Sequence, residues 1–274
     1  MKRLFAVLVA VPLFGTGLFV VAPAASANGA GDLVKIRLHR AIKNLDVARE
    51  TRRGYEREKF QHWVDADGDC RDTRDEVLAN ESRVGVSGCD IAVGKWRSYY
   101  DRRTFRHSAN LDVDHMVPLA EAWDSGAKRW NAATRKRFAN DLGDPRSLVA
   151  VSASSNRSKS DRDPAEWMPQ FGKCRYVREW VAVKIRWHLK VNRVEKVALR
   201  NRGSGCENVM LRVRKATIRT GSTSGGGGGG GGTDPRFDYC YQAVAAGYGP
   251  YYKGQDEEYW WYTDGDSDGV VCES

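Results

Sequence analysis

A run of glycines near the C-terminus limits the fold of this 274-residue chain more than any other feature. Residues 221–232 read GSTSGGGGGGGG, which offers no apolar side chain to a core and leaves the backbone free to adopt many conformations. Such a stretch is typical of a flexible linker, with a reach on the order of 20 Å. We therefore predict a body before the run and a module at residues 233–274. A module of about forty residues needs a disulfide or a metal to fold.

The first 27 residues have the pattern of a signal peptide. Two basic residues precede an apolar run over residues 4–21, and Ala25-Ser26-Ala27 provides the small residues that signal peptidase accepts. An uncleaved membrane anchor is the alternative. The small residues directly behind the run favour cleavage after Ala27. Later stretches are too polar to span a bilayer, so the sequence predicts a secreted protein without a transmembrane segment after cleavage.

Six cysteines follow the predicted cleavage point. An even number of cysteines in an exported protein indicates disulfides, and no Cys-x-x-Cys spacing argues for a zinc site. Six cysteines allow fifteen pairings. Their grouping into three well-separated doublets favours Cys70–Cys89, Cys174–Cys206 and Cys240–Cys272.

Charge is unevenly distributed along the chain, whose formal net charge is +9. Residues 233–274 contain two basic and nine acidic residues, a net charge of −7, whereas residues 28–232 have a net charge of +14. A basic body suits a polyanionic partner such as nucleic acid or an acidic cell-surface polymer. An acidic module suits a hard cation such as calcium.

Apolar periodicity in the body predicts a mixture of helices and short strands, an α+β fold. In chain order, we expect an amphipathic helix over residues 32–53, a β-hairpin region over 84–107, two short helices over 120–142 separated at Gly126, a strand over 148–151, a helix that contains Asn156 and Lys159, and a buried helix over 174–191.

The stretch LDVDHMVPL at residues 111–119 places an acid and a histidine at the end of a short apolar strand. Pro118 gives no N–H to a ladder and therefore marks the exit of that strand. Strand alternation puts Asp112 on the same face as Asp114 and away from His115. A polar pair held at a strand end is a common way to build a rigid site.

The Asp-His pair leaving one strand, a second strand, and Asn156-x-x-Lys159 on the following helix together resemble the ββα-metal (HNH) nuclease motif. The wider pattern DHMVPLAEAW…RFAND…LVAVS…SNRSKSDRDPAEW…C, over roughly residues 63–206, is similar to secreted bacterial HNH endonucleases related to the C-terminal part of GmrSD restriction enzymes. This resemblance implies that His115 is the general base and that Asp114 and Asn156 bind the catalytic metal.

Phosphodiester hydrolysis needs an activated water and a cation that neutralises developing charge. A histidine with a pKa near neutrality can take the proton of the water. Few protein ligands, mostly oxygen, suit Mg²⁺ or Mn²⁺, and Lys159, one helical turn from Asn156, is predicted to hold the phosphate. Many such motifs orient the histidine with an asparagine before the second strand. Ser147 stands there in this chain. A backbone carbonyl could orient His115 instead, and we expect a slower enzyme if no group does.

The C-terminal segment reads DGDSDGVVCES from residue 264. Asp at the first, third and fifth positions with Gly at the sixth matches the opening of an EF-hand loop, in which alternate carboxylates converge on Ca²⁺. The twelfth position is missing, so a neighbouring glutamate or backbone oxygens would complete the site. The segment from Cys240 resembles the excalibur calcium-binding domain. The predicted calcium ligands are Asp264, Asp266, Asp268 and Glu273.

Asp65, Asp67 and Asp69 form a second acidic stretch with partial likeness to a calcium loop. Gly68 is at the fourth position rather than the sixth, which departs from the EF-hand pattern. A turn pinned by Cys70 explains the stretch equally well, and both interpretations stay open.

The sequence therefore predicts a secreted, disulfide-bonded α+β protein with a ββα-metal (HNH) endonuclease domain at residues 28–220, the linker at 221–232, and a calcium-binding module at 233–274. Its expected substrate is DNA, with RNA as a second candidate. We expect little sequence preference, because phosphate contacts carry no sequence information. The alternative is a non-catalytic, calcium-dependent protein that binds an extracellular or cell-wall polymer. Association with a cell wall through the module is compatible with both.

Overall fold

A computed structural model describes residues 31–221, 236–245, 251–253, 257–265 and 269–272. The predicted signal peptide, nearly all of the glycine-rich linker and three predicted calcium ligands, Asp266, Asp268 and Glu273, lie outside the described residues. Within the described part of the chain, no helix is both long and apolar enough to cross a membrane.

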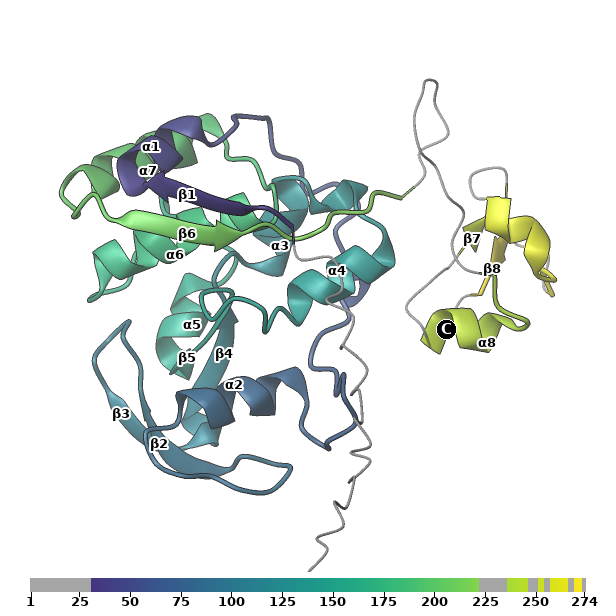
Figure 1. The fold of residues 1–274 in the computed structure, drawn as a ribbon, viewed down its shortest axis with the longest axis horizontal. Helices are drawn as coiled ribbons and strands as arrows, with labels where there is room; N and C mark the ends of the chain where they lie inside the picture. Colours follow the sequence, from purple (N-terminus) through teal and green to yellow (C-terminus); the bar gives the residue numbers. More distant parts are fainter. Residues whose placement is uncertain (1–30, 222–235, 246–250, 254–256, 266–268, 273–274) are drawn as a thin grey trace, which may run out of the picture.

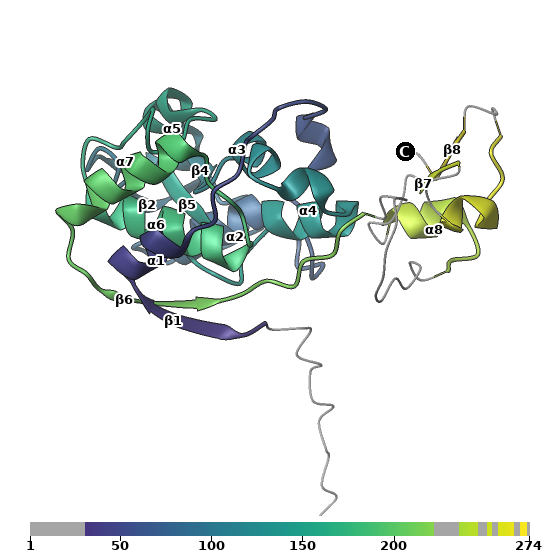
Figure 2. The same ribbon diagram turned by 90° about the horizontal axis from the view of Figure 1, so that it is seen from above.

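One part of the body consists of a two-stranded antiparallel sheet covered by helices (Figures 1 and 2). Its elements are β1 (Leu33–Arg37), α1 (Leu38–Asn44), α6 (Lys173–Arg186), α7 (Arg193–Ser204) and β6 (Met210–Arg214). The register pairs Leu33 with Arg214 and Arg37 with Met210. The expected helix over residues 32–53 is thus wrong except at Leu38–Asn44, since residues 33–37 form a strand and residues 45–53 are not helical. The backbone of residues 33–37 pairs with a strand that lies far away in sequence, and local periodicity does not report such a partner.

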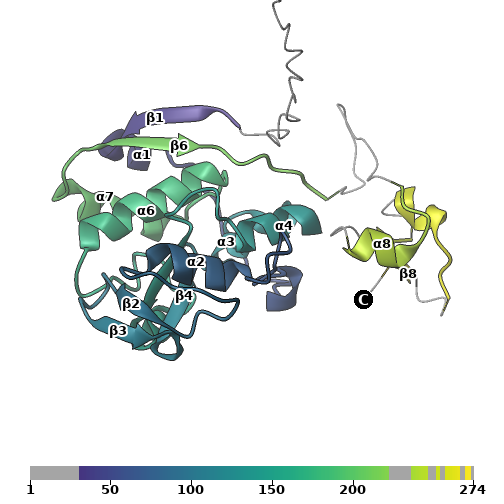
Figure 3. The ribbon, with the colours of Figure 1, turned by 60° about the horizontal axis from the view of Figure 1, so that its bottom comes forward.

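The other part of the body contains the strand with the Asp-His pair. This strand, β4 (Leu111–His115), pairs antiparallel with β5 (Leu148–Ser152), and α5 (Ala153–Lys159) follows β5 directly. The neighbouring elements are α2 (Thr73–Glu81), the hairpin of β2 (Val93–Arg97) and β3 (Thr104–His107), and the short 3-10 helices η1 (Arg57–Lys59) and η2 (Ser108–Asn110). Figure 3 shows α6 between the β1–β6 pair and these elements.

The segment between β4 and β5 forms short helices, as expected. They are α3 (Leu119–Asp124), η3 (Ala127–Arg129) and α4 (Ala132–Ala139), and Gly126 lies between the first two with a φ of 146°. Trp123, Trp130 and Phe138 are all buried in the main core. Phe138 contacts Trp130 and Trp187, the residue after α6, and Phe60 lies between Phe138 and Trp123. Phe138 also contacts His115, which places the insert next to the end of β4.

The two faces of β4 meet different surroundings. Leu111 and Val113 pack in one cluster with residues of α2 and β2. Asp112 and Asp114 alternate with them and face α5 instead, where they contact its side chains. This alternation agrees with the sequence expectation and separates the side chains of the site into two groups.

Three disulfides join the cysteines in the pairs that their grouping along the sequence favoured, Cys70–Cys89, Cys174–Cys206 and Cys240–Cys272. The third belongs to the C-terminal module. That module contains α8 (Cys240–Ala245), β7 (Tyr251–Tyr252), η4 (Glu257–Trp261) and β8 (Val270–Val271), with β7 antiparallel to β8. Its small core of buried side chains consists of Ala243, Tyr251, Tyr259, Val271 and the disulfide.

Candidate active site

His115 is the last residue of β4, and only 7% of it is exposed. The rings of Trp63, His62 and Phe138 surround it, with Trp63 stacked on the imidazole at a centroid distance of 5.3 Å. Its Nε2 lies 2.8 Å from the carbonyl oxygen of Ala139. A carbonyl oxygen only accepts hydrogen bonds, so Nε2 carries the proton and Nδ1 keeps the lone pair that a general base needs.

Burial lowers the pKa of His115 to about 3, against the opposing effect of the hydrogen bond with Ala139 and with a smaller contribution from Arg57. The expectation of a pKa near neutrality is therefore wrong, because aromatic side chains enclose the ring and disfavour its charged form. The imidazole of His115 is neutral throughout the physiological pH range. It is thus held in the neutral form of a general base, and a pKa this low makes it a weak base.

Ser147 does not take the place of an orienting asparagine. Its hydroxyl donates to Asp141 at 2.6 Å, and its carbonyl accepts from the backbone N–H of Met116 at 2.9 Å. The carbonyl of Ala139 orients His115 instead, as the departure at Ser147 allowed. Ala139 ends α4, so the helical insert supplies this group.

Asn140 is a residue of the site that sequence reasoning missed. Its side-chain oxygen accepts hydrogen bonds from the backbone N–H of Val64 at 3.2 Å and from the hydroxyl of Thr73 at 2.9 Å. Asn140 directly follows Ala139, so one short segment both orients His115 and ties down the loop that covers it. Asn140 lies in the RFAND stretch of the pattern that carries the family resemblance, and this position was the sequence signal that could have identified it.

Asp114 lies on the other face of β4 in a buried network. Lys159 Nζ donates to its two carboxylate oxygens at 2.7 and 2.8 Å, and the hydroxyl of Tyr100 donates to Oδ2 at 2.5 Å. Burial raises the pKa of Asp114, and Lys159 and Tyr100 oppose this rise. Burial likewise lowers the pKa of Lys159, against the attraction of Asp114. The two buried charges form a close ion pair and neutralise each other.

Lys159 does not have the role that its spacing suggested. It is fully buried, and its ammonium also donates to the backbone carbonyl of His115 at 2.8 Å. An ammonium has three protons, and two oxygens of Asp114 and this carbonyl take all of them. The prediction that Lys159 holds a phosphate is therefore contradicted. Lys159 instead fixes the Asp114-His115 dipeptide at the end of β4.

Asn156 is half-buried on α5, and its Nδ2 donates to Asp112 Oδ2 at 3.2 Å. The same oxygen lies 3.7 Å from Nε of Arg157, whose side chain is 76% exposed. Asp112, which strand alternation had separated from His115, thus supports Asn156. The structure places Asp114 and Asn156 between β4 and α5, each held by a partner of its own.

Asp114 and Asn156 carry the oxygen atoms that the resemblance predicted as metal ligands. A carboxylate offers about four lone-pair sites, and Asp114 uses three of them, one on Oδ1 and two on Oδ2. One site on Oδ1 therefore stays available. Asn156 donates through its nitrogen, which leaves its amide oxygen as a ligand. A set of one carboxylate oxygen and one amide oxygen suits Mg²⁺ or Mn²⁺, which keep several waters.

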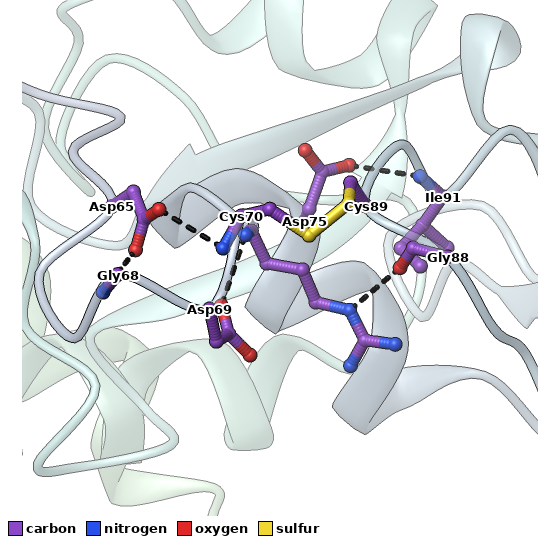
Figure 4. The surroundings of a disulfide bond; sticks show 9 residues. Asp65, Gly68, Asp69, Cys70, Asp75, Gly88, Cys89 and Ile91 are labelled. Atoms are coloured by element: carbon purple, nitrogen blue, oxygen red, sulfur yellow. Dashed lines mark hydrogen bonds between the residues drawn. A yellow bond between two sulfur atoms is a disulfide. The ribbon is translucent and has the colours of Figure 1, made fainter.

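The acidic stretch at Asp65 is a turn beside the Cys70–Cys89 disulfide (Figure 4). Asp65 accepts from the backbone N–H groups of Gly68 and Cys70 at 2.8 and 3.0 Å. The carboxylates of Asp65, Asp67 and Asp69 are exposed and have oxygens within 4.8 Å of one another. The turn hydrogen bonds account for the conformation of this loop without a cation.

In the C-terminal module, the structure describes the first of the predicted calcium ligands. Asp264 Oδ2 accepts from the hydroxyl of Tyr259 at 2.7 Å and from the backbone N–H of Gly269 at 2.9 Å. Gly269 has a φ of 87°, the conformation expected for the sixth position of a calcium loop.

Comparisons with known proteins agree with this combination of mixed helix-strand body and acidic module. The family model "GmrSD restriction endonucleases, C-terminal domain" matches residues 71–202, and the model "Excalibur calcium-binding domain" matches residues 237–273. A protein of Arthroderma benhamiae named "Uncharacterized secreted protein" is 41% identical over 157 residues, which cover 56% of this chain and 76% of that protein. No solved structure matches the chain significantly.

The body is thus a nuclease-type α+β domain, joined to a calcium-binding module of the excalibur type. The chain belongs to the family of proteins that share the C-terminal domain of the GmrSD restriction endonucleases.

Proposed function

We propose that this protein is a secreted, metal-dependent HNH endonuclease that hydrolyses phosphodiester bonds of DNA, and of RNA as a second candidate, with little sequence preference. The observation that carries the proposal is the state of His115. Its neutral ring is oriented through Nε2 by the Ala139 carbonyl, with Nδ1 left to accept a proton. A histidine that serves only as a core residue has no need of one unused nitrogen at the end of a strand.

In this mechanism, His115 Nδ1 removes the proton of the attacking water and passes it on to solvent. Asp114 and Asn156 would hold Mg²⁺ or Mn²⁺, which supplies charge neutralisation at the phosphate and at the leaving oxygen. Arg157 takes over the phosphate contact that was predicted for Lys159. Its guanidinium is exposed beside Asp112, and a guanidinium matches phosphate geometry.

The substrate class follows from charge. The body has a net charge of +14 over residues 28–232, and such a surface attracts the phosphate backbone whatever the base sequence.

The proposal that the protein is secreted rests on the signal-like N-terminus and on the name of the Arthroderma relative. We further propose that the module binds Ca²⁺ and associates with cell-wall or surface polymer. The alternative function is calcium-dependent polymer binding without catalysis.

The test is a plasmid-cleavage assay on the purified full-length protein, with Mg²⁺ or Mn²⁺ added after dialysis against chelator. Removal of a general base costs about 10²-fold or more in rate, so we expect His115→Ala to lose nearly all cleavage. His107→Ala is the control, since His107 is an exposed histidine on β3. Intact plasmid with the wild type, or equal cleavage by His115→Ala, would refute the proposal.

Asp114→Ala separates the nuclease from the alternative function. A nuclease loses metal-dependent cleavage in this variant, and a polymer-binding protein keeps its affinity for DNA or cell-wall polymer. Polymer binding that is equal in Asp114→Ala and in a wild type that does not cleave DNA would favour the alternative.

A further inference from the structure

The two-stranded sheet of β1 and β6 has one face toward the core and one face toward solvent. Ile36, Leu211 and Val213 pack in the main core, and the helices lie on that side of the strands (Figure 2). The residues that alternate with them are exposed. Four of these exposed side chains are cations, and we call them and the two strands the basic ribbon: Lys35, Arg37, Arg212 and Arg214.

The cations of the basic ribbon are not neutralised by the protein. Among the residues that the structure describes, none of the four forms an ion pair with a carboxylate. The register also places Lys35 directly opposite Arg212, at a Cβ separation of about 4.5–5.5 Å. Like charges at directly opposite positions destabilise a sheet. This pair therefore costs stability in the free protein, and an anion bound over the face would remove that cost.

Hydrogen bonds from the body hold the basic ribbon in place. Arg146 and Arg186 donate to the backbone carbonyls of Arg212 and Arg214 at 2.9 and 2.7 Å. These carbonyls lie on the edge of β6 that β1 does not cover. The four cations thus project from a strand pair that is fixed on both edges, which makes their spacing regular.

The shape of the basic ribbon favours duplex DNA over a flexible acidic polymer. The major groove of B-DNA is about 12 Å wide and admits a two-stranded β-ribbon. On each strand of the ribbon, the cations stand at alternate residues, about 6.6 Å apart, where they can contact phosphates or the guanine edges in the groove. The major groove of duplex RNA is deep and too narrow for side chains to read. A ribbon of this kind therefore distinguishes the two duplexes.

We propose that the basic ribbon is a second binding surface for double-stranded DNA and that it binds in the major groove. Both strands lie outside residues 71–202, so the family match does not assign this surface. Helix α6 lies between the ribbon and β4, which carries His115 (Figure 3). The inference rests on the proposed function, since it takes nucleic acid as the substrate, and it selects DNA over RNA.

Two double variants with equal charge changes provide the test and its control. Lys35→Gln/Arg212→Gln removes the opposed cations and keeps long polar side chains on the ribbon. Arg83→Gln/Arg106→Gln removes two exposed cations from the region of the β2–β3 hairpin. The ribbon variant loses a repulsive pair, so we expect its thermal transition at the wild-type temperature or above.

Fluorescence anisotropy measures binding of the full-length protein to a labelled DNA duplex and to an RNA duplex of the same sequence. Chelator is present so that metal-dependent cleavage does not occur, and inorganic polyphosphate serves as a polyanion without a groove. Each phosphate contact contributes about 0.9 to the slope of log affinity against log salt. For DNA, we expect the ribbon variant to lower that slope by about 2 and to weaken binding about tenfold or more near 0.1 M salt. Binding of RNA and polyphosphate, and all binding by the control variant, should stay at the wild-type level.

Unchanged DNA affinity in the ribbon variant, or an equal loss in the control variant, overturns the inference. A loss by the same factor for RNA or polyphosphate also overturns it, because the face would then bind any polyanion. If the ribbon variant shows no cooperative thermal transition, the wild type decides, since equal affinity for the two duplexes overturns the inference as well. A wild type that prefers the DNA duplex but does not cleave DNA when metal is added refutes the proposed function alone.

Discussion

A buried lysine surrounded by glutamates makes the stability of this protein depend on pH. Lys184 is fully buried, with Nζ 2.6 Å from Glu121 and 3.3 Å from Glu195. Glu50 has a carboxylate oxygen within 4.8 Å of those of the other two glutamates. One ammonium cannot balance three carboxylates, so the fully ionised cluster has excess negative charge. Burial raises the pKa of Glu195 to about 7, and Lys184 opposes this rise.

The sign of the pH effect follows from that pKa. The folded protein binds the Glu195 proton more tightly than the unfolded chain, whose reference pKa is 4.5. Stability contributed by this proton is present below pH 4.5 and is lost as the pH rises through about 7. One pKa unit corresponds to about 1.4 kcal/mol, so linkage gives a loss of roughly 2–3 kcal/mol between pH 5 and pH 8.

Glu195→Gln tests this reasoning. The side-chain oxygen of glutamine can still accept the hydrogen bond that Trp180 Nε1 donates at 2.5 Å, and the amide cannot ionise. We expect the free energy of unfolding of the variant minus that of the wild type to be roughly 2–3 kcal/mol larger at pH 8 than at pH 5, so the variant is relatively more stable at pH 8. Urea denaturation followed by tryptophan fluorescence measures both values. Glu207→Gln, an exposed glutamate, is the control. The same difference at both pH values would refute the reasoning.

Two further predictions concern the other charged sites. Lys159→Met leaves the Asp114 carboxylate buried without its cation and should lower the free energy of unfolding by about 3–5 kcal/mol, as measured by urea denaturation. Addition of Asp114→Leu to this variant should restore stability. A loss below about 1 kcal/mol in Lys159→Met would contradict the buried ion pair. Asp264→Asn should weaken Ca²⁺ binding by the full-length protein about tenfold or more in a calorimetric titration, because ligand charge sets calcium affinity. The exposed Asp238→Asn should not, and equal affinities in the two variants would exclude Asp264 as a ligand.

Several features of the site were predictable because they depend on short stretches of sequence. The apolar alternation around Asp112 and Asp114 predicted β4 and the face on which each carboxylate lies, and the structure agrees. The departure at Ser147 showed that another group, such as a backbone carbonyl, could orient His115. It did not predict that this carbonyl belongs to Ala139, because nothing in the local pattern records how α4 packs against the end of β4.

The roles of the charged residues were not predictable in the same way. Spacing on α5 placed Lys159 on the face of Asn156, and that face is turned toward β4. Whether a lysine on it reaches substrate or a buried carboxylate depends on the depth of packing, which a helical period does not contain. The low pKa of His115 has the same origin, since it depends on aromatic rings contributed by distant segments.

By itself, the sequence determined the division into a basic body and an acidic module, the favoured cysteine pairs, and the strand that carries Asp114 and His115. These follow from composition, spacing and period, which act between near neighbours in the chain. Only the tertiary structure decided that residues 33–37 form a strand, that Lys159 pairs with Asp114, and that Ala139 orients His115. Each of these depends on a hydrogen bond or ion pair between segments that only folding brings together.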